Sequence, residues 1–337
     1  MVATFPTLCP NLQEISLKCL PRDPIITAAV SGMILASNRN TLQCLRVDSP
    51  LTDEAYEVVF SFPNLDWLSV VVERDASSTS VVLPNLIHLI VRYEHDGDWL
   101  RVFRRATFGK LEAVTCYSES ERIGDFLGAF ERVGLVASVQ NTLSVFYLHT
   151  SCSWNPNYSS LLPFTRLTDI FIGFSCDNGC SSTVDDDIIT DPARAMPKLE
   201  TLRLGGSPCR EIHTGVTTKG LVTLANHCPD LSALRVHFQV ASLSTSPAVV
   251  GTASDAGPTA LRRGCALEEL EVGEIPMLEE SVSMVALTLA RIFPRIRYIN
   301  SYSHWNWQKV LEAICLSREI EDHSGEEHPP LRASKQL

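Results

Sequence analysis

The stretch GVTTKGLVTLANHCPDLSALRVHF, residues 215–238, contains the repeat unit that decides the fold. Its second part has apolar residues at Leu231, Leu234 and Val236, and the last two alternate with polar residues as in a strand with one buried face. Its first part has apolar residues at helical spacing behind threonines that can cap a helix. The stretch therefore predicts a helix followed by a short strand.

The strand pattern P-x-L-x-x-L-x-L returns along the whole chain at irregular steps of 21 to 36 residues. Units this short cannot bury their own apolar faces, so they have to stack, with strands in a parallel ribbon on one side and helices on the other. We therefore predict a curved α/β solenoid. The eleven copies have as their first apolar residue Leu12, Leu42, Leu65, Leu86, Leu111, Leu143, Leu167, Leu199, Leu231, Leu267 and Ile296.

A compact doubly wound α/β domain is the alternative, because its buried strands also precede helices. Such domains usually have a glycine-rich phosphate turn after a strand. The nearest candidate, Gly205-Gly206, has no third glycine at the required spacing, which favours the solenoid.

Composition and charge narrow the class of protein. The 337 residues are 45% hydrophobic and 20% charged, as in an ordinary folded protein. A formal charge of −11 argues against nucleic acid as a partner. The longest apolar run, MVALTLA at 284–290, is too short for a membrane span. Eleven scattered cysteines indicate reduced thiols, so we expect a protein of the cytoplasm or nucleus with no membrane partner.

The chain resembles the leucine-rich repeats of F-box proteins, particularly a group found in fungi, from Phe5 to about Val310. The resemblance implies a leucine-rich-repeat horseshoe over residues 1–316, with about eleven irregular repeats, a parallel ribbon on the concave face and helices on the convex face. It is clearest in a combination at one repeat junction, formed by Val216, Thr217, Gly220, Leu221, His227, Cys228, Pro229 and Leu231.

The same resemblance implies a function. In that family an N-terminal F-box docks on the Skp-type adaptor of a cullin ubiquitin ligase, and the repeats hold the protein substrate. The first repeat begins within ten residues of Met1, so adaptor and cullin are expected partners only if an F-box is encoded upstream. Leu20–Ile26, LPRDPII, predicts a turn followed by a helix from near Ile25. The alternative is a stand-alone repeat scaffold or regulatory protein unrelated to ubiquitin.

Candidate chemical motifs favour structural interpretations. The spacing of Cys176 and Cys180 resembles half of a zinc site, but no second thiol pair follows. Asp185–Asp187 suit a helix cap before Ile188. Adjacent His227 and Cys228 do not face each other on a helix, and the pairs Glu268-Glu269 and Glu279-Glu280 suit a solvated edge. We therefore expect no enzyme activity, no cofactor and no metal, and rank a hydrolase or redox enzyme far behind a binding module.

The candidate binding residues lie at positions 3, 5 and 7 of the repeats, which strand alternation directs away from the core. Trp, Tyr and Arg are frequent there, and these types dominate binding energy at interfaces. We expect Trp67, Tyr117, Tyr147 and Phe171 to form an aromatic stretch flanked by arginines that suits an acidic or phosphorylated peptide, unless they pack on one another or on loops. The full set is Arg46, Trp67, His88, Arg92, Tyr117, Tyr147, His149, Phe171, Arg203, Arg235 and His237.

Two segments stand outside the repeat pattern. Residues 239–264 are rich in Ser, Thr, Ala, Gly and Pro, which predicts a flexible inserted loop. Residues 317–337 lose apolar residues and gain charge, which predicts a disordered polar tail. Between repeats and tail, HWNWQKVLEAI at 304–314 predicts an amphipathic helix that covers the last strand.

Overall fold

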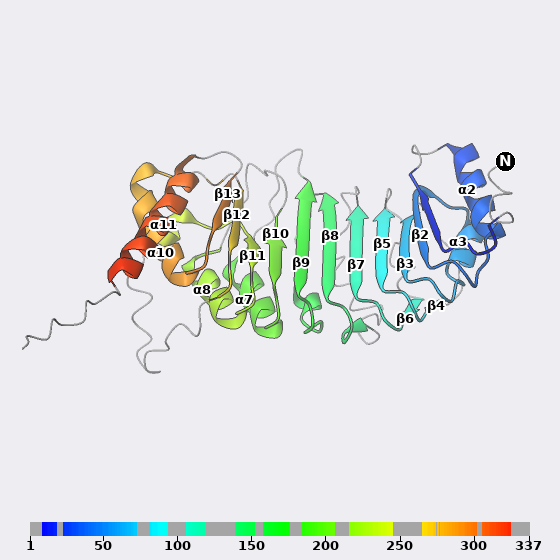
Figure 1. Cartoon of the computed structure of the whole chain (residues 1–337), viewed down its shortest axis with the longest axis horizontal. Coiled ribbons are helices and arrows are strands. Elements are labelled where there is room, and N and C mark those ends of the chain that lie inside the picture. Colours follow the sequence, from blue (N-terminus) through cyan, green and yellow to red (C-terminus); the bar gives the residue numbers. More distant parts are fainter. Residues whose placement is uncertain are drawn as a thin grey trace, which may run out of the picture.

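The computed structural model describes residues 9–18, 23–72, 81–93, 106–118, 139–151, 158–175, 184–205, 216–244, 265–273, 275, 277–301 and 305–324. Their main element is one open sheet of eleven parallel strands, which lie side by side in a row (Figure 1). Its strands are β1 (Glu14–Leu17), β2 (Cys44–Pro50), β3 (Trp67–Val72), β5 (His88–Tyr93), β7 (Ala113–Ser118), β8 (Val145–Ser151), β9 (Asp169–Ser175), β10 (Thr201–Leu204), β11 (Ala233–Arg235), β12 (Glu269–Gly273) and β13 (Tyr298–Ser301).

The strands follow one another in the sheet in the order of the sequence. A doubly wound domain reverses its strand order at a switch point, and no reversal occurs among the described strands. The compact alternative is therefore wrong, and the prediction of an α/β chain with stacked parallel strands is confirmed. Its arrangement is that of a solenoid-like α/β fold.

The repeated leucines explain why the strands stack in this way. From Leu42 to Ile296, the first apolar residue of each copy is at most 1% exposed, and Leu12 is partly buried. Each fully buried leucine contributes roughly 2 kcal/mol by leaving water. These side chains share one apolar cluster with residues of the helices, including Leu221 and Leu224, so the helices cover the leucine side of the sheet.

The backbone repeats the same contact at every step of the sheet. The carbonyl oxygen at the second position of one copy accepts hydrogen bonds from two consecutive N–H groups of the next. At the second step, Gln43 O accepts from Asp66 N at 2.8 Å and from Trp67 N at 3.1 Å. Ser232 O accepts in the same way from Glu268 N and Glu269 N, although a long insertion separates the two copies. Repeat length therefore varies without changing the contact with which each pair of strands begins.

Two helices lie at the N-terminal end of the row. Helix α2 (Pro24–Ala36) begins after Asp23, whose side chain accepts a hydrogen bond from Ile25 N at 2.8 Å, so the helix predicted after LPRD is confirmed. Helix α3 (Asp53–Val59) begins after Thr52, whose hydroxyl accepts from Ala55 N. Both starts follow the usual preference for a short polar side chain at the N-cap.

A second set of helices accompanies the C-terminal strands, and the described connections in the middle of the chain contain other elements. After β3 and β5, the described connections contain β4 (Val81–Leu83) and β6 (Ala106–Phe108), which pair in a small parallel sheet, and the 3-10 helix η2 (Tyr158–Leu161) precedes β9. The C-terminal set is α7 (Asp186–Ala195), α8 (Thr218–His227), α9 (Val240–Ser244), η3 (Glu279–Ser281), α10 (Val282–Ile292) and α11 (Trp305–Ser324).

Two predicted boundaries were wrong. The tail predicted from residue 317 does not begin there, because α11 continues to Ser324 and Arg318 donates a hydrogen bond to Ile296 O at 2.8 Å. Residues 325–337 lie outside the described part of the chain. The loop predicted over 239–264 contains α9 at its start, while residues 245–264 lie outside the described part of the chain. The end-covering helix is confirmed, since Trp307, Val310 and Ile314 of α11 are buried.

Among the described helices, none combines the length and the apolar character that a membrane crossing requires.

Candidate binding face

The predicted binding residues lie on the sheet face opposite the leucines, which we call the ladder face. Strand register joins positions 3, 5 and 7 of the copies into three rows that run across the strands. The first row includes Trp67 and His88, the second includes Tyr147, Phe171 and Arg203, and the third includes Arg92, Tyr117, His149 and Gly173. Residues between these positions point into the core.

A first ring group lies on β2, β3 and β5. The guanidinium of Arg46 lies over the Trp67 ring, 4.5 Å from its centroid, and the His88 ring lies 4.4 Å from Trp67 by centroids. Both neighbours of Trp67 in the sheet therefore cover its ring. Its indole Nε1 is buried and has no acceptor among the described residues.

A second ring group lies on β7, β8 and β9. Tyr147 and Phe171 stack with centroids 4.0 Å apart and ring planes 2° from parallel. Tyr117 is 5.8 Å from Tyr147 and 6.2 Å from His149 by ring centroids, and the Arg92 guanidinium lies 5.7 Å from the Tyr117 ring. The aromatic stretch predicted from the sequence thus forms two groups, each with arginine on one ring.

Gly173 makes room for the stacked pair. A Cβ atom placed on Gly173 would lie 2.5 Å from Cε1 of Phe171 and 3.3 Å from Cδ2 of His149. Real Cβ atoms do not approach other atoms so closely, so a larger residue at 173 would displace the Phe171 ring. Gly173 was not among the predicted site residues, and only its position in the third row could have indicated it.

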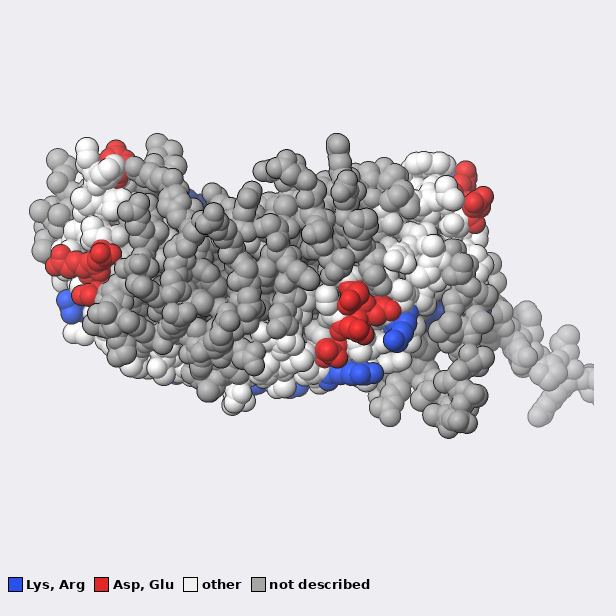
Figure 2. Space-filling view, turned by 180° about the vertical axis from the view of Figure 1, so that it is seen from behind, with Lys and Arg blue, Asp and Glu red and all other residues white. Residues whose placement is uncertain are grey.

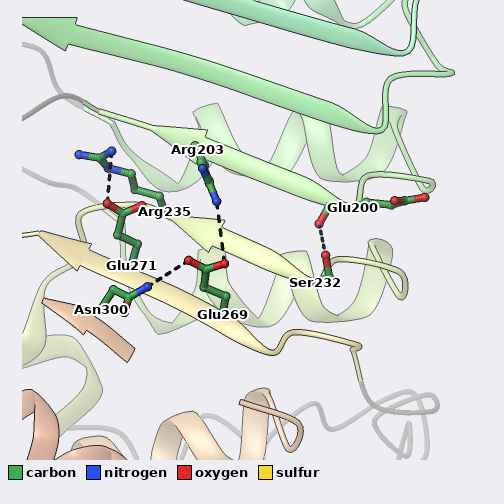
Figure 3. Close-up of polar contacts among 7 residues, drawn as sticks. All are labelled: Glu200, Arg203, Ser232, Arg235, Glu269, Glu271 and Asn300. Atoms are coloured by element: carbon green, nitrogen blue, oxygen red, sulfur yellow. Dashed lines mark hydrogen bonds and ion pairs between the residues drawn. The ribbon is translucent and has the colours of Figure 1, made fainter. Parts of the chain in front are cut away.

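Arg92, Arg203 and Arg235 on the ladder face are paired with carboxylates of the same face, and the sequence pattern did not predict these pairs. Arg203 Nη2 lies 3.9 Å from Glu269 Oε2, and Arg235 Nη1 lies 3.3 Å from Glu271 Oε1 (Figure 3). Asn300 Nδ2 donates to Glu269 Oε1 at 3.0 Å, which orients that carboxylate from β13. The C-terminal half of the face is therefore a network of paired charges.

The third arginine pair spans three strands. Arg92 on β5 donates a hydrogen bond to Asp48 on β2, so both side chains extend across β3. The register between β2 and β3 shifts between Arg46 and Pro50, and Val71 of β3 pairs with both Pro50 and Arg92. A small apolar side chain at that point leaves the two charged groups free to meet. Among the described residues, Arg46 is the arginine of this set that makes no ion pair.

Two predicted site residues are much less accessible than expected. Arg235 is 9% exposed and His237 is 8% exposed, so both are nearly buried on this face. The His237 ring lies against Gly205, whose φ of 111° favours glycine, and a Cβ there would be 3.0 Å from His237 Cδ2. Within the described part of the chain, His237 Nε2 has no hydrogen-bond partner. Burial, and then the positive charge of Arg235, lower the pKa of His237 to about 4, while Glu271 acts in the opposite direction.

Tyr147 and His149 of the second group stay neutral near pH 7. Burial raises the pKa of Tyr147, Tyr117 raises it further, and Arg203 and Arg235 lower it. Burial also lowers the pKa of His149. The Tyr147 hydroxyl therefore keeps its proton and can donate a hydrogen bond to a partner.

The other candidate motifs have structural positions or lie outside the described residues. Asp185 caps α7, as its side chain accepts from Ile188 N at 2.9 Å, which confirms the predicted cap. Cys176 and Cys180 lie outside the described part of the chain. Cys228 is fully buried, as expected of a small core residue, and burial raises its thiol pKa to about 12. The described residues contain no group of three metal-ligating side chains.

Charge is distributed differently elsewhere on the surface. Seen from behind, the described surface has acidic side chains in small separate groups, some with Lys or Arg beside them (Figure 2). On the ladder face, by contrast, Arg92, Arg203 and Arg235 each face a carboxylate. The chain has a formal charge of −11, but three arginines of the face that contains the predicted binding residues are paired with carboxylates.

The fold and the ladder face define an α/β protein with an open, consecutive parallel sheet and half-buried rings on its free face. Compared with models of known protein families and with curated proteins, the chain matches none.

Proposed function

We propose that the chain is a leucine-rich-repeat horseshoe that binds a segment of another protein on its ladder face, without chemistry of its own. The observation that supports this most is the pair of ring groups around Trp67 and Tyr147, which are partly exposed at the centre of an open sheet face. Aromatic side chains and arginines in such positions account for most of the binding energy in protein interfaces.

The geometry of the ladder face suits the binding of a partner protein. The rings are held by neighbours on adjacent strands, so little rotamer freedom is lost when a partner binds. Arg92 and Arg203 are oriented by carboxylates, so the direction of each guanidinium is fixed before a partner binds. Such a preorganised polar and aromatic surface favours recognition over turnover.

Within this proposal, the more specific role is recognition of a substrate for a cullin ubiquitin ligase. It rests on the likeness of residues 215–238 to the repeats of F-box proteins, and it requires an adaptor-binding module. The second role is a repeat scaffold or regulatory protein without a link to ubiquitin, which the same face would serve equally well. Cytoplasm and nucleus are the compartments that fit both roles.

Affinity capture of the tagged chain from its native cells, followed by mass spectrometry, tests the proposal. The variant Trp67→Ala with Tyr147→Ala should lose its partners while its circular dichroism stays that of the unchanged protein. Trp305→Ala is the matched control, because Trp305 is 63% exposed on α11, away from the ladder face. Unchanged capture by the double variant would refute binding at this face.

The composition of the captured material separates the two roles. A Skp-type adaptor and a cullin in stoichiometric amounts would support the ligase role. Capture of other proteins that depend on Trp67 and Tyr147, without adaptor or cullin, would support the scaffold.

A further inference from the structure

The charges of the ladder face are balanced, although the chain as a whole is acidic. Among the described residues, positions 3, 5 and 7 of the copies contain five cationic and five acidic side chains. The cationic ones are Lys18, Arg46, Arg92, Arg203 and Arg235, and the acidic ones are Glu14, Asp48, Asp169, Glu269 and Glu271. The formal charge of −11 therefore comes from other positions of the chain.

Most arginines of the face are already matched by a carboxylate. Arg92, Arg203 and Arg235 each form an ion pair with an acidic side chain of the same face. A carboxylate or phosphate of a partner would have to displace the acidic group that is in place, so it would gain little free energy from these arginines.

The surroundings of Arg46 also contain negative charge. Burial raises the pKa of the Cys44 thiol, Arg46 lowers it, and Glu14 and Asp66 raise it, so all three charged groups lie near that thiol. Beyond the ring groups, Asp169 accepts a hydrogen bond from an uncharged threonine hydroxyl, and this contact leaves its negative charge in place. The ladder face as a whole thus favours neither an acidic nor a basic partner.

The middle of the ladder face has no charged side chain. It lies on β7 and β8, in the centre of the row of strands in Figure 1. Burial raises the pKa of the tyrosine on β8 and lowers that of the histidine beside it, so both are neutral near pH 7. The six residues at the outward positions, which we call the uncharged section, are Ala113, Thr115, Tyr117, Val145, Tyr147 and His149.

Short side chains lie between longer ones in this section. In the strand register, Thr115 stands between Ile90 of β5 and Tyr147 of β8, and Ala113 stands beside Val145. All five residues are half-buried, so part of each side chain reaches the surface. Because the side chains of β7 project less far at these two positions, a partner side chain can approach the sheet there and contact apolar groups on neighbouring strands.

We propose that the uncharged section binds an apolar, uncharged segment of the partner protein. The inference deepens the proposed function and rests on it. Its basis is the match in charge, since a charged group laid over the section would leave water without a counter-charge, which is costly. An apolar segment has no such cost and gains from the apolar surface that both sides remove from water.

The length of the segment follows from the sheet. From β5 to β9 there are three steps in the strand order, or about 14 Å at about 4.8 Å per strand. An extended peptide that runs across the strands advances about 3.4 Å per residue, so about four residues cover the section. A peptide of nine residues is therefore long enough to include the whole run.

Selection from a random library of nine-residue peptides displayed on phage tests the inference. The unchanged full chain is the bait, and the variant Thr115→Lys is used to remove peptides that bind elsewhere. The retained sequences should share an uncharged run of about four residues in which apolar side chains predominate. Retained runs rich in acidic or basic residues, or the retention of no peptide at all, would overturn the inference.

Synthetic copies of the retained peptides then show how much charge contributes to binding. Fluorescence polarisation measures their Kd at low and at high concentrations of sodium chloride. Salt screens interactions between exposed charges but not apolar contacts, so the Kd should change less than about twofold between about 0.05 M and about 0.5 M. A Kd that rises about tenfold or more over this range would mean that charges drive the binding, contrary to the proposal.

Three variants locate the binding, and circular dichroism checks that each is folded. Thr115→Lys places a charge in the uncharged section and should weaken binding of the retained peptides about tenfold or more, whereas Thr115→Val, of similar size and uncharged, should bind at least as tightly as the unchanged chain. Gln308→Lys adds the same charge at an exposed position of α11 and should have no effect.

Equal binding by the two Thr115 variants would place the peptide site elsewhere and refute the inference. Partner capture that depends on Trp67 and Tyr147 would still support the proposed function in that case, so the two failures are distinguishable.

Discussion

The carboxylate of Asp186, in the first turn of α7, accepts two hydrogen bonds from Thr217, the N-cap residue of α8. Oδ1 accepts from the backbone N–H at 2.7 Å, and Oδ2 accepts from the hydroxyl at 2.6 Å. The Thr217 hydroxyl in turn accepts from Lys219 N at 3.2 Å, so it caps its own helix while it donates to the preceding repeat. One side chain therefore ties the start of a helix to the start of the next.

Removal of this tie should destabilise the C-terminal repeats. Asp186→Ala leaves two donors of Thr217 without their partner, and hydrogen bonds to a charged group contribute about 2 kcal/mol to the free energy of unfolding. Urea denaturation followed by circular dichroism measures the loss. Asp187→Ala makes the same charge change at an exposed neighbour and should cost about 0.5 kcal/mol or less. Equal losses in the two variants would show that charge, and not the Thr217 contact, is the cause.

The same carboxylate leaves no room for a side chain at Gly220 in α8. A Cβ on Gly220 would lie 2.5 Å from Asp186 Oδ1, and the bonds to Thr217 prevent that oxygen from moving away. Gly220→Ala should therefore destabilise the protein by about 1–2 kcal/mol, against a helix propensity that favours alanine by about 1 kcal/mol. Gly32→Ala in α2 is the control, because its Cβ would meet no atom within 4 Å. It should stabilise by about 0.5–1 kcal/mol, and a loss at both sites would contradict the steric explanation.

The stacked-strand fold was predictable because its cause is local. Burial of residues such as Leu231 and Leu234 depends on spacing within one copy, and the same spacing recurs in each neighbour. The side of the sheet on which each candidate residue lies was predictable for the same reason. Contacts within that face were less predictable. Arg235 and Glu271 are direct neighbours only once the register of β11 and β12 is known, and Asp48 reaches Arg92 across a strand because of a register shift.

Composition alone predicts the wrong end for the C-terminal helix. Residues 317–324, SREIEDHS, are mostly polar, but Arg and Glu are also good helix formers. The helix continues from a buried first half that contains Trp307 and Val310, and Arg318 binds back to Ile296 O. A helix that is anchored by packing extends at little cost into a polar stretch, and a count of apolar residues does not detect that.

The Phe171–Tyr147 stack should depend on the glycine beneath it. Gly173→Ala forces the Phe171 ring away from its place over residue 173, which should weaken the near-ultraviolet circular dichroism of the rings and lower stability by about 1–3 kcal/mol. The cause is checked by combination with Phe171→Ala, which removes the clashing ring. In that background Gly173→Ala should add almost nothing, and a full further loss would mean that Phe171 is not the obstacle.

The described cysteines should differ strongly in reactivity. Burial raises the pKa of Cys228 to about 12, with a further increase from Cys265, and burial raises the pKa of Cys265 to about 11. Cys315 is exposed on α11. Because the thiolate is the reactive form, iodoacetamide near neutral pH should label Cys315 roughly tenfold or more faster than Cys228 and Cys265, as measured by peptide mass spectrometry. In urea the three rates should converge, and rapid native labelling of Cys228 would contradict its burial.

Protonation of His237 should oppose folding at mildly acidic pH. The pKa of His237 is 6.5 in the unfolded chain and about 4 in the folded chain, owing first to burial and then to Arg235. Between these pH values the unfolded state binds a proton that the folded state does not bind. The contribution to stability is complete above about pH 6.5 and decreases as the pH falls toward 4. Between about pH 7.5 and about pH 5.5 the loss is about 1 kcal/mol. His237→Gln does not titrate, so urea denaturation at both pH values should show a smaller loss by that amount. An equal pH dependence in the variant and the unchanged protein would mean that His237 is accessible to protons in the folded state.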